Sequence, residues 1–161
     1  PHLDARDNVT LMARRSGWDR RRVAERVGEL SRLVHLSEDE LDRLPSRLSG
    51  GQRQRLAIAR AIAADPHILI LDDCLSAVDS NTEHAILENL RRVFEGRTGI
   101  IISHRVRALR DCDAIVVLDG QGAADYGTHE ELVARPGYYQ IIAREQLKVK
   151  EPADRLEEPA L

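Results

Sequence analysis

A serine and two glycines open one of the predicted helices, at a position where an anion can bind. In the stretch Leu48-Ser49-Gly50-Gly51-Gln52, Ser49 and Gln52 have the spacing of a helix capping box. The first turn of a helix leaves backbone N–H groups free at the positive end of the helix dipole. Because Gly50 and Gly51 have no Cβ, a phosphate can approach this backbone closely, and the Ser49 hydroxyl adds a donor. An ordinary capped helix with a glycine turn has the same short sequence.

Two acidic residues end a short apolar run further along the chain. The run Ile68–Leu71 is apolar throughout, which predicts a parallel strand that is buried on both faces. Asp72 and Asp73 follow it directly. The sequence therefore predicts that two carboxylates lie at the edge of a sheet.

Other chemically active side chains form no recognisable site. None of the six histidines has the spacing to another histidine or to a cysteine that is typical of a zinc site. Ser103 and His104 are neighbours, but adjacency in sequence does not make a catalytic triad. Arginine clusters are interleaved with acidic residues and the formal net charge is −3, so solvated helix faces are favoured over a nucleic-acid surface.

The elements that must position these residues alternate between helices and strands. This alternation predicts an α/β domain with a parallel sheet, preceded by a helical lobe. After the Ile68–Leu71 strand, strands are predicted at Gly99–Ile102, at Ala114–Leu118 and, beyond a hairpin at Asp119–Gly122, near Tyr126. Helices are predicted at six capping residues: Asp4, Asp19, Ser37, Ser49, Ser80 and Thr128.

Composition limits the class of protein. The chain has 161 residues, of which 42% are hydrophobic and 32% charged, as expected for one globular domain rather than a disordered chain. No apolar run approaches the ~20 residues of a membrane span. Cys74 and Cys112 form no CxxC pair, which favours a reduced cytosolic setting.

The longer sequence around the glycine turn resembles a known family. The fourteen residues Leu48–Ala61 resemble the signature motif of ATP-binding cassette (ABC) ATPases. The resemblance implies a partial P-loop NTPase-like fold, with a parallel sheet and an N-terminal helical subdomain. It implies a helical subdomain at 1–48, the C-terminal part of the ATPase core at 49–147 and a disordered tail at 148–161.

Further motifs follow in the order that the family has. Ile68–Asp72 resembles the Walker B strand, so Asp72 is expected to hold Mg²⁺, an ion that prefers oxygen ligands and keeps part of its water shell. Asp73 stands where the family usually has the glutamate that polarises the attacking water. Ser76–Asp79 resembles the D-loop, and His104 resembles the switch histidine that contacts the γ-phosphate.

Two departures from the family pattern limit what the resemblance implies. The phosphate-binding loop G-x-x-x-x-G-K-[ST] does not occur, because no glycine of the 161 residues precedes a lysine. The chain is therefore expected to be a C-terminal fragment of a cassette. Its exposed strand edge and apolar faces favour self-association or dependence on the missing N-terminal part. Asp73, one methylene shorter than glutamate, resembles the weakened site of asymmetric transporters; a variant that works slowly is the alternative.

The two ends of the chain resemble different subfamilies. Pro1–Val9 and the helix after Trp18 resemble importer-type cassettes, whereas the sequence from Asp72 to Gln140 resembles the exporter type. An unusual lineage or a recombined or engineered chimera would both explain this, and the chimera is favoured.

The expected function is that of a nucleotide-binding domain of an ABC transporter, which couples ATP binding and hydrolysis to transmembrane transport. Ser49–Gln52, with Asp79 nearby, would complete an ATP and Mg²⁺ site on a second ABC ATPase domain in a head-to-tail dimer. The second partner would be a transmembrane domain, with this chain at the cytoplasmic face of the membrane and inactive alone. The alternatives are a non-enzymatic module that docks on a partner cassette and a soluble ABC ATPase that acts on DNA or ribosomes.

Overall fold

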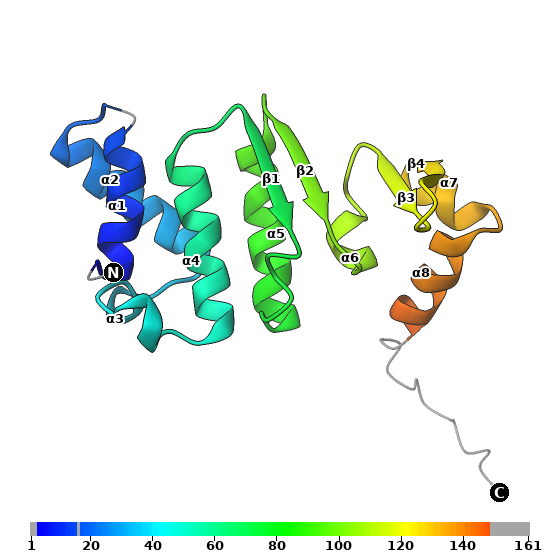
Figure 1. Cartoon of the computed structure of the whole chain (residues 1–161), viewed down its shortest axis with the longest axis horizontal. Helices are drawn as coiled ribbons and strands as arrows, with labels where there is room; N and C mark the ends of the chain where they lie inside the picture. Colours follow the sequence, from blue (N-terminus) through cyan, green and yellow to red (C-terminus); the bar gives the residue numbers. More distant parts are fainter. Residues whose placement is uncertain (1–2, 16, 149–161) are drawn as a thin grey trace, which may run out of the picture. The chain divides into compact units, whose positions relative to one another are not determined.

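The computed structural model describes residues 3–15 and 17–148, and the chain divides into two compact units, Pro1–Ile102 and Ser103–Leu161 (Figure 1). Each unit has a hydrophobic core of its own. In the first unit, one core joins side chains from both sides of residue 48, from Ala5 to Leu90. The predicted domain boundary at 48 stays a prediction, and the predicted tail falls, from residue 149 on, outside the described residues.

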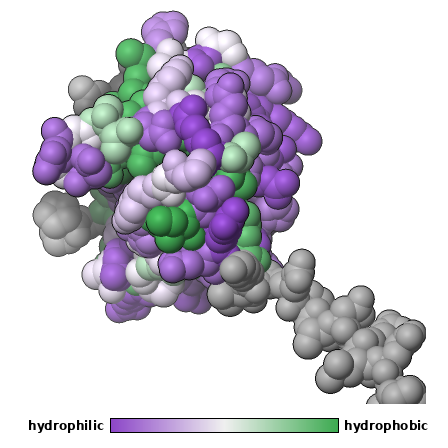
Figure 2. All heavy atoms as spheres, turned by 90° about the vertical axis from the view of Figure 1, so that its right-hand side faces the viewer, coloured by the Kyte–Doolittle hydropathy of each residue, from purple (hydrophilic) through white to green (hydrophobic). Residues whose placement is uncertain are grey.

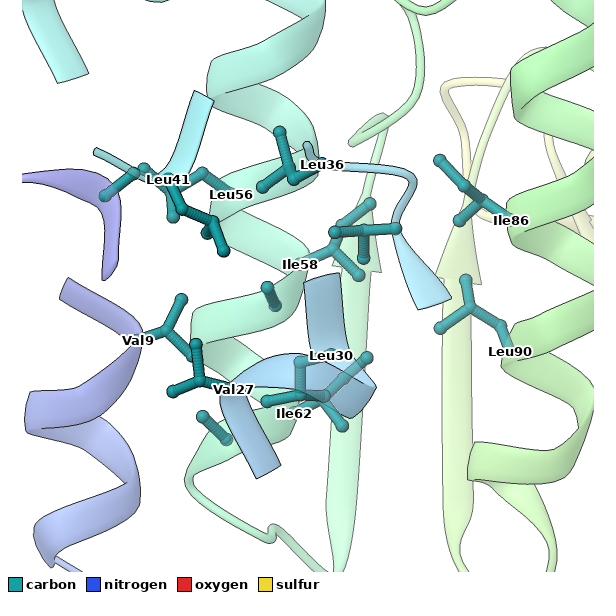
Figure 3. Close-up of a cluster of buried hydrophobic side chains, with 14 of the residues drawn as sticks. Val9, Val27, Leu30, Leu36, Leu41, Leu56, Ile58, Ile62, Ile86 and Leu90 are labelled. Atoms are coloured by element: carbon teal, nitrogen blue, oxygen red, sulfur yellow. The ribbon is translucent and has the colours of Figure 1, made fainter. Parts of the chain in front are cut away.

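The first unit packs helices against one face of a small sheet. Figure 3 shows its core, to which α1, α2, α4 and α5 all contribute side chains. Leu30, Ile62 and Ile86 are fully buried in it. The elements are α1 (Ala5–Arg15), α2 (Arg20–Leu33), α3 (Glu38–Leu41), the 3₁₀ turn η1 (Pro45–Arg47), α4 (Gly50–Ala63), β1 (Ile68–Asp72), α5 (Ser80–Phe94) and β2 (Thr98–Ile102).

Side-chain caps begin the helices of this unit. Asp4 accepts a hydrogen bond from the Asp7 N–H at 2.7 Å, and Asp19 accepts one from the Arg22 N–H at 2.8 Å, as predicted. The predicted cap of α5 is wrong by one residue. Asp79, in extended backbone, accepts from the Thr82 N–H at 3.0 Å, and Ser80 is the first helical residue.

The sheet of the first unit has one open face. β1 and β2 pair in parallel, with Ile70 opposite Ile100 and Asp72 opposite Ile102. Leu69 and Leu71 face the core, whereas Ile70 and Ile102 are more than half exposed. The prediction that β1 is buried on both faces is therefore wrong, because the helices of this unit cover only the Leu69–Leu71 side.

Up to Lys148, where the described residues end, the second unit is a hairpin with three helices. β3 and β4 pair antiparallel through the predicted hairpin, with an irregularity between Val117 and Leu118. His129 and Tyr139 are buried together, with His129 Nδ1 2.9 Å from the Tyr139 hydroxyl. On the face that Figure 2 draws, hydrophobic residues form separate green patches among mostly hydrophilic ones. The elements are α6 (Val106–Leu109), β3 (Ile115–Leu118), β4 (Ala123–Gly127), α7 (His129–Ala134) and α8 (Tyr138–Lys148).

Within the described part of the chain, no helix has both the length and the apolar character that crossing a bilayer requires.

Candidate functional site

A complete capping box fixes the conformation of the turn at the start of α4. The Ser49 hydroxyl accepts from the Gln52 N–H at 3.2 Å, and the Gln52 Oε1 accepts from the Ser49 N–H at 2.7 Å. Helix geometry leaves the N–H groups of Gly50 and Gly51 without partners inside the helix. Ser49 and Gly50 are exposed. The turn therefore presents two backbone donors and a hydroxyl at the positive end of a 14-residue helix, which suits a phosphate.

The part-buried carboxylate of Glu40 on α3 supports this turn. Glu40 accepts hydrogen bonds from the Ser37 N–H at 2.8 Å and from the Gln52 side-chain amide, and Arg55 Nη2 lies 3.7 Å from it. Burial alone would raise the pKa of Glu40, but the hydrogen bonds from Ser37 and Gln52 and the charge of Arg55 lower it below its usual range. Both ends of the Gln52 side chain are thus engaged within the protein. Gln52 supports the shape of the turn, whereas Ser49 and Gly50 are exposed.

The same turn lies directly against the segment that resembles the D-loop. A Cβ at Gly51 would lie 2.6 Å from the Ala77 carbonyl oxygen, so only glycine fits here. Asp79 ends this segment, where its carboxylate caps α5; the hydrogen bond from the Thr82 backbone is the main cause that lowers the pKa of Asp79. The structure therefore brings Ser49–Gln52 and residues 76–78, just before Asp79, into one site.

The two acidic residues after β1 have different environments. Asp72 is exposed on the open face of the sheet, and Asp73 is half-buried in a left-handed conformation with φ +41°. The Asp73 N–H donates to the Ile102 carbonyl at 2.9 Å. Aspartate tolerates this backbone region better than most residues do. The structure therefore turns the chain sharply at Asp73, which the sequence did not predict.

The residues fit a magnesium ion only as part of a larger ligand set. Among the described residues, no group of three or more histidine, cysteine or acidic side chains is arranged to hold a metal ion. Asp72 offers a single exposed carboxylate, and Mg²⁺ commonly takes one or two carboxylates together with phosphate oxygens and water. Asp72 therefore fits a magnesium ion that arrives with a nucleotide.

His104 belongs to the second unit, and its expected contact with the γ-phosphate stays a prediction. It is exposed, and its backbone carbonyl accepts from the Gln146 side-chain amide at 2.8 Å. This bond ties the loop after β2 to α8 within the second unit.

Cys74 lies beside Asp73 and belongs to none of the motifs named above. Burial raises the pKa of its thiol to about 11, and the nearby carboxylates of Asp73, Asp72 and Glu83 add to the effect. Burial also raises the pKa of Cys112 in the second unit.

Both thiols are therefore expected to react slowly with maleimide at pH 8, because only the thiolate is nucleophilic. The Cys74 rate should be roughly 100-fold below that of an ordinary thiol with pKa ~8.5, and it should rise about tenfold per pH unit until pH 11. Mass spectrometry of labelled peptides measures both rates. A Cys74 rate that levels off near pH 9 would contradict the burial of this thiol.

Comparisons with known proteins agree with this geometry. Residues 1–76 match the family model described as ABC transporter. The chain is 52% identical over 101 residues to the probable multidrug resistance ABC transporter ATP-binding/permease protein YheI of Bacillus subtilis, covering 62% of this chain and 17% of the relative. It is 47% identical over 97 residues to the ATP-dependent lipid A-core flippase of Neisseria gonorrhoeae, covering 60% and 16%.

Solved structures show the same likeness. A bacterial Atm1-family ABC exporter with ATP bound aligns with a TM-score of 0.75 and 32% identity, over 91% of this chain and 26% of that chain. A dimeric bacterial ABC transporter cassette aligns with a TM-score of 0.73 and 30% identity, over 80% and 57%. The fold is thus that of part of an ABC-type ATPase. Residues 1–76 thus match the ABC transporter family, and the chain spans about a sixth of the length of the first two curated relatives.

Proposed function

We propose that this chain acts as part of the nucleotide-binding domain of an ABC exporter and supplies its signature turn to ATP held by a second cassette. The observation that supports this most is the turn itself, where an exposed serine and two glycines open a long helix and are braced by Glu40 and Gln52. Phosphate is the anion that suits such a turn. Curated relatives named as a multidrug transporter and a lipid flippase favour export.

Each site residue has a proposed role. The Ser49 hydroxyl and the N–H groups of Gly50 and Gly51 bind phosphate oxygens of the nucleotide, and Gln52 keeps the turn in shape. Asp79 lies at the edge of the same site. On this chain's own side of a dimer, Asp72 is the carboxylate for Mg²⁺, Asp73 orients water and His104 contacts the terminal phosphate.

The proposed partners follow from this division of roles. A second ABC ATPase domain, arranged head to tail, provides the G-x-x-x-x-G-K-[ST] loop that the 161 residues do not contain. A transmembrane domain provides the transport path and places the chain at the cytoplasmic face of the membrane. The 161 residues alone are expected neither to bind ATP tightly nor to hydrolyse it.

Ser49→Ala is expected to weaken Mg-ATP-dependent association with a partner cassette about tenfold, because a hydrogen bond to a charged phosphate is lost. The partner in this test is the YheI cassette with the serine that aligns with Ser49 replaced, so that it pairs with itself less tightly than with this chain. Analytical ultracentrifugation measures the dissociation constant.

The matched control is Thr128→Ala, which removes an equivalent capping box in the second unit. Both substitutions should cost about 1 kcal/mol of stability, as loss of a helix cap does. Only Ser49→Ala should change association. Equal affinities for the two variants, or no Mg-ATP-dependent association of the unsubstituted chain, would overturn the proposed function.

A further inference from the structure

Gln54 on α4 makes two hydrogen bonds to the segment that follows Asp73. Its Oε1 accepts from the Ala77 N–H at 2.8 Å, and its Nε2 donates to the Ser76 hydroxyl at 2.8 Å. These bonds join residues 22 and 23 positions apart in sequence. A helix does not need such bonds for its own stability, so their effect is on the segment they hold.

The Ser76 hydroxyl is also hydrogen-bonded to the backbone of Asp73. It donates to the Asp73 carbonyl at 2.9 Å, and the Ser76 N–H donates to the same oxygen at 3.2 Å. Because the hydroxyl has one proton, which it gives to Asp73, it can only accept from Gln54. The bonds therefore form a directed chain from Gln54 through Ser76 to the left-handed turn at Asp73.

The turn at Ser49–Gln52 contacts the same segment, one helical turn before Gln54. Gly51 lies so close to the Ala77 carbonyl that a Cβ could not be placed there without a shift of backbone. Gln54 is one helical turn further along α4. A displacement of the first turn of α4 would therefore move residues 76 and 77. Ser76 would pass the movement to the backbone carbonyl of Asp73, to which it is hydrogen-bonded.

We propose that Gln54 is a positioning residue that couples the Ser49–Gln52 turn to the backbone of Asp73, through Ser76 and Ala77. Engagement of the turn by phosphate then changes how the Asp73 carboxylate is held. This coupling rests on the proposed function for its biological meaning. The hydrogen bonds from Gln54 to Ser76 and Ala77, and from Ser76 to Asp73, form what we call the clamp, and they are present in the free chain.

Cys74 reports on the clamp, because it lies between Asp73 and Ser76 and is half-buried. In Gln54→Ala, the maleimide rate of Cys74 in the free chain at pH 8 should rise about tenfold, the opening expected when two ordinary hydrogen bonds are lost. The rate of Cys112, in the other unit, should not change. Gln54→Glu keeps the acceptor for Ala77 and should give an intermediate rate.

Asn89→Ala is the matched control. Asn89 is also a side-chain amide of the first unit with a long-range hydrogen bond, donated to the Leu33 carbonyl at 3.0 Å. Its loss should lower stability similarly and leave the Cys74 rate unchanged. A Cys74 rate in Gln54→Ala equal to that of the unsubstituted chain or of Asn89→Ala would overturn the clamp, whatever the outcome for the proposed function.

A second measurement tests the coupling in the complex with the signature-deficient YheI cassette and saturating Mg-ATP. The Cys74 rate of the unsubstituted chain should change on complex formation, and that of Gln54→Ala should not respond. An equal response in both chains would overturn the coupling. Absence of any complex would count against the proposed function alone, and the free-chain rates would still decide whether Gln54 holds Asp73.

Discussion

Asp73→Glu is expected to raise ATP turnover about 100-fold when a phosphate-binding loop is supplied to this chain's own site. A glutamate reaches one methylene further toward the attacking water, and a misplacement of ~1 Å in a catalytic group can cost ~10²-fold in rate. The loop is supplied as the N-terminal segment of the YheI cassette, mixed with the chain. Turnover is measured as phosphate release at saturating Mg-ATP.

The same substitution should lower stability. Asp73 has φ +41°, and glutamate tolerates left-handed backbone less well than aspartate, at a cost of about 1 kcal/mol. Asp65→Glu is the matched control, because Asp65 has φ +50° and lies outside the site, paired with Arg97. Asp65→Glu should lower stability by a similar amount and leave ATP turnover unchanged. Unchanged turnover in Asp73→Glu would show that Asp73 does not act on water.

Gly51→Ala and Gly50→Ala, two neighbouring substitutions of the same kind, are expected to differ by about 2 kcal/mol in the free energy of unfolding. The new Cβ at Gly51 would lie 2.6 Å from a backbone carbonyl, and such overpacking costs about 1–3 kcal/mol. At Gly50 it would lie 3.6 Å from the Ala77 Cβ, an ordinary contact. Alanine there should be neutral or slightly stabilising, as in helices generally.

Urea denaturation of the two variants measures this difference. The pair controls for helix propensity, because both glycines are in the first turn of α4. Gly51→Ala should also displace residues 76–78 and abolish Mg-ATP-dependent association with the partner cassette. Equal stabilities would mean that α4 and residues 76–78 are not in contact, which would remove the structural basis of the clamp as well.

Local features of the site could be predicted from sequence. The capping boxes at Ser37, Ser49 and Thr128 join residues three positions apart, so the pattern of residue types contains the whole interaction. The cap of α5 was predicted one residue late, since Asp79 and Ser80 can both cap a helix. Which one takes the extended backbone depends on the packing of the preceding segment.

Contacts over longer separations could not be predicted. Glu40 reaches Gln52 across 12 positions, and Gln54 reaches Ser76 and Ala77 across 22 and 23; no pattern of spacing in the sequence indicates these contacts. The open face of the sheet was missed for a related reason. An apolar run indicates that a strand can be buried on both faces, but which face is covered depends on the helices that pack against it.

The central claim is that Gly50 and Gly51 bind phosphate of a nucleotide held by a partner. Amide NMR of the isotopically labelled chain tests it most directly, with the signature-deficient YheI cassette unlabelled. We expect the Gly50 and Gly51 N–H signals to stay in place with Mg-ATP alone and to shift when Mg-ATP and the cassette are both present. Signals that stay in place with both present, or that shift fully with Mg-ATP alone, would contradict the account.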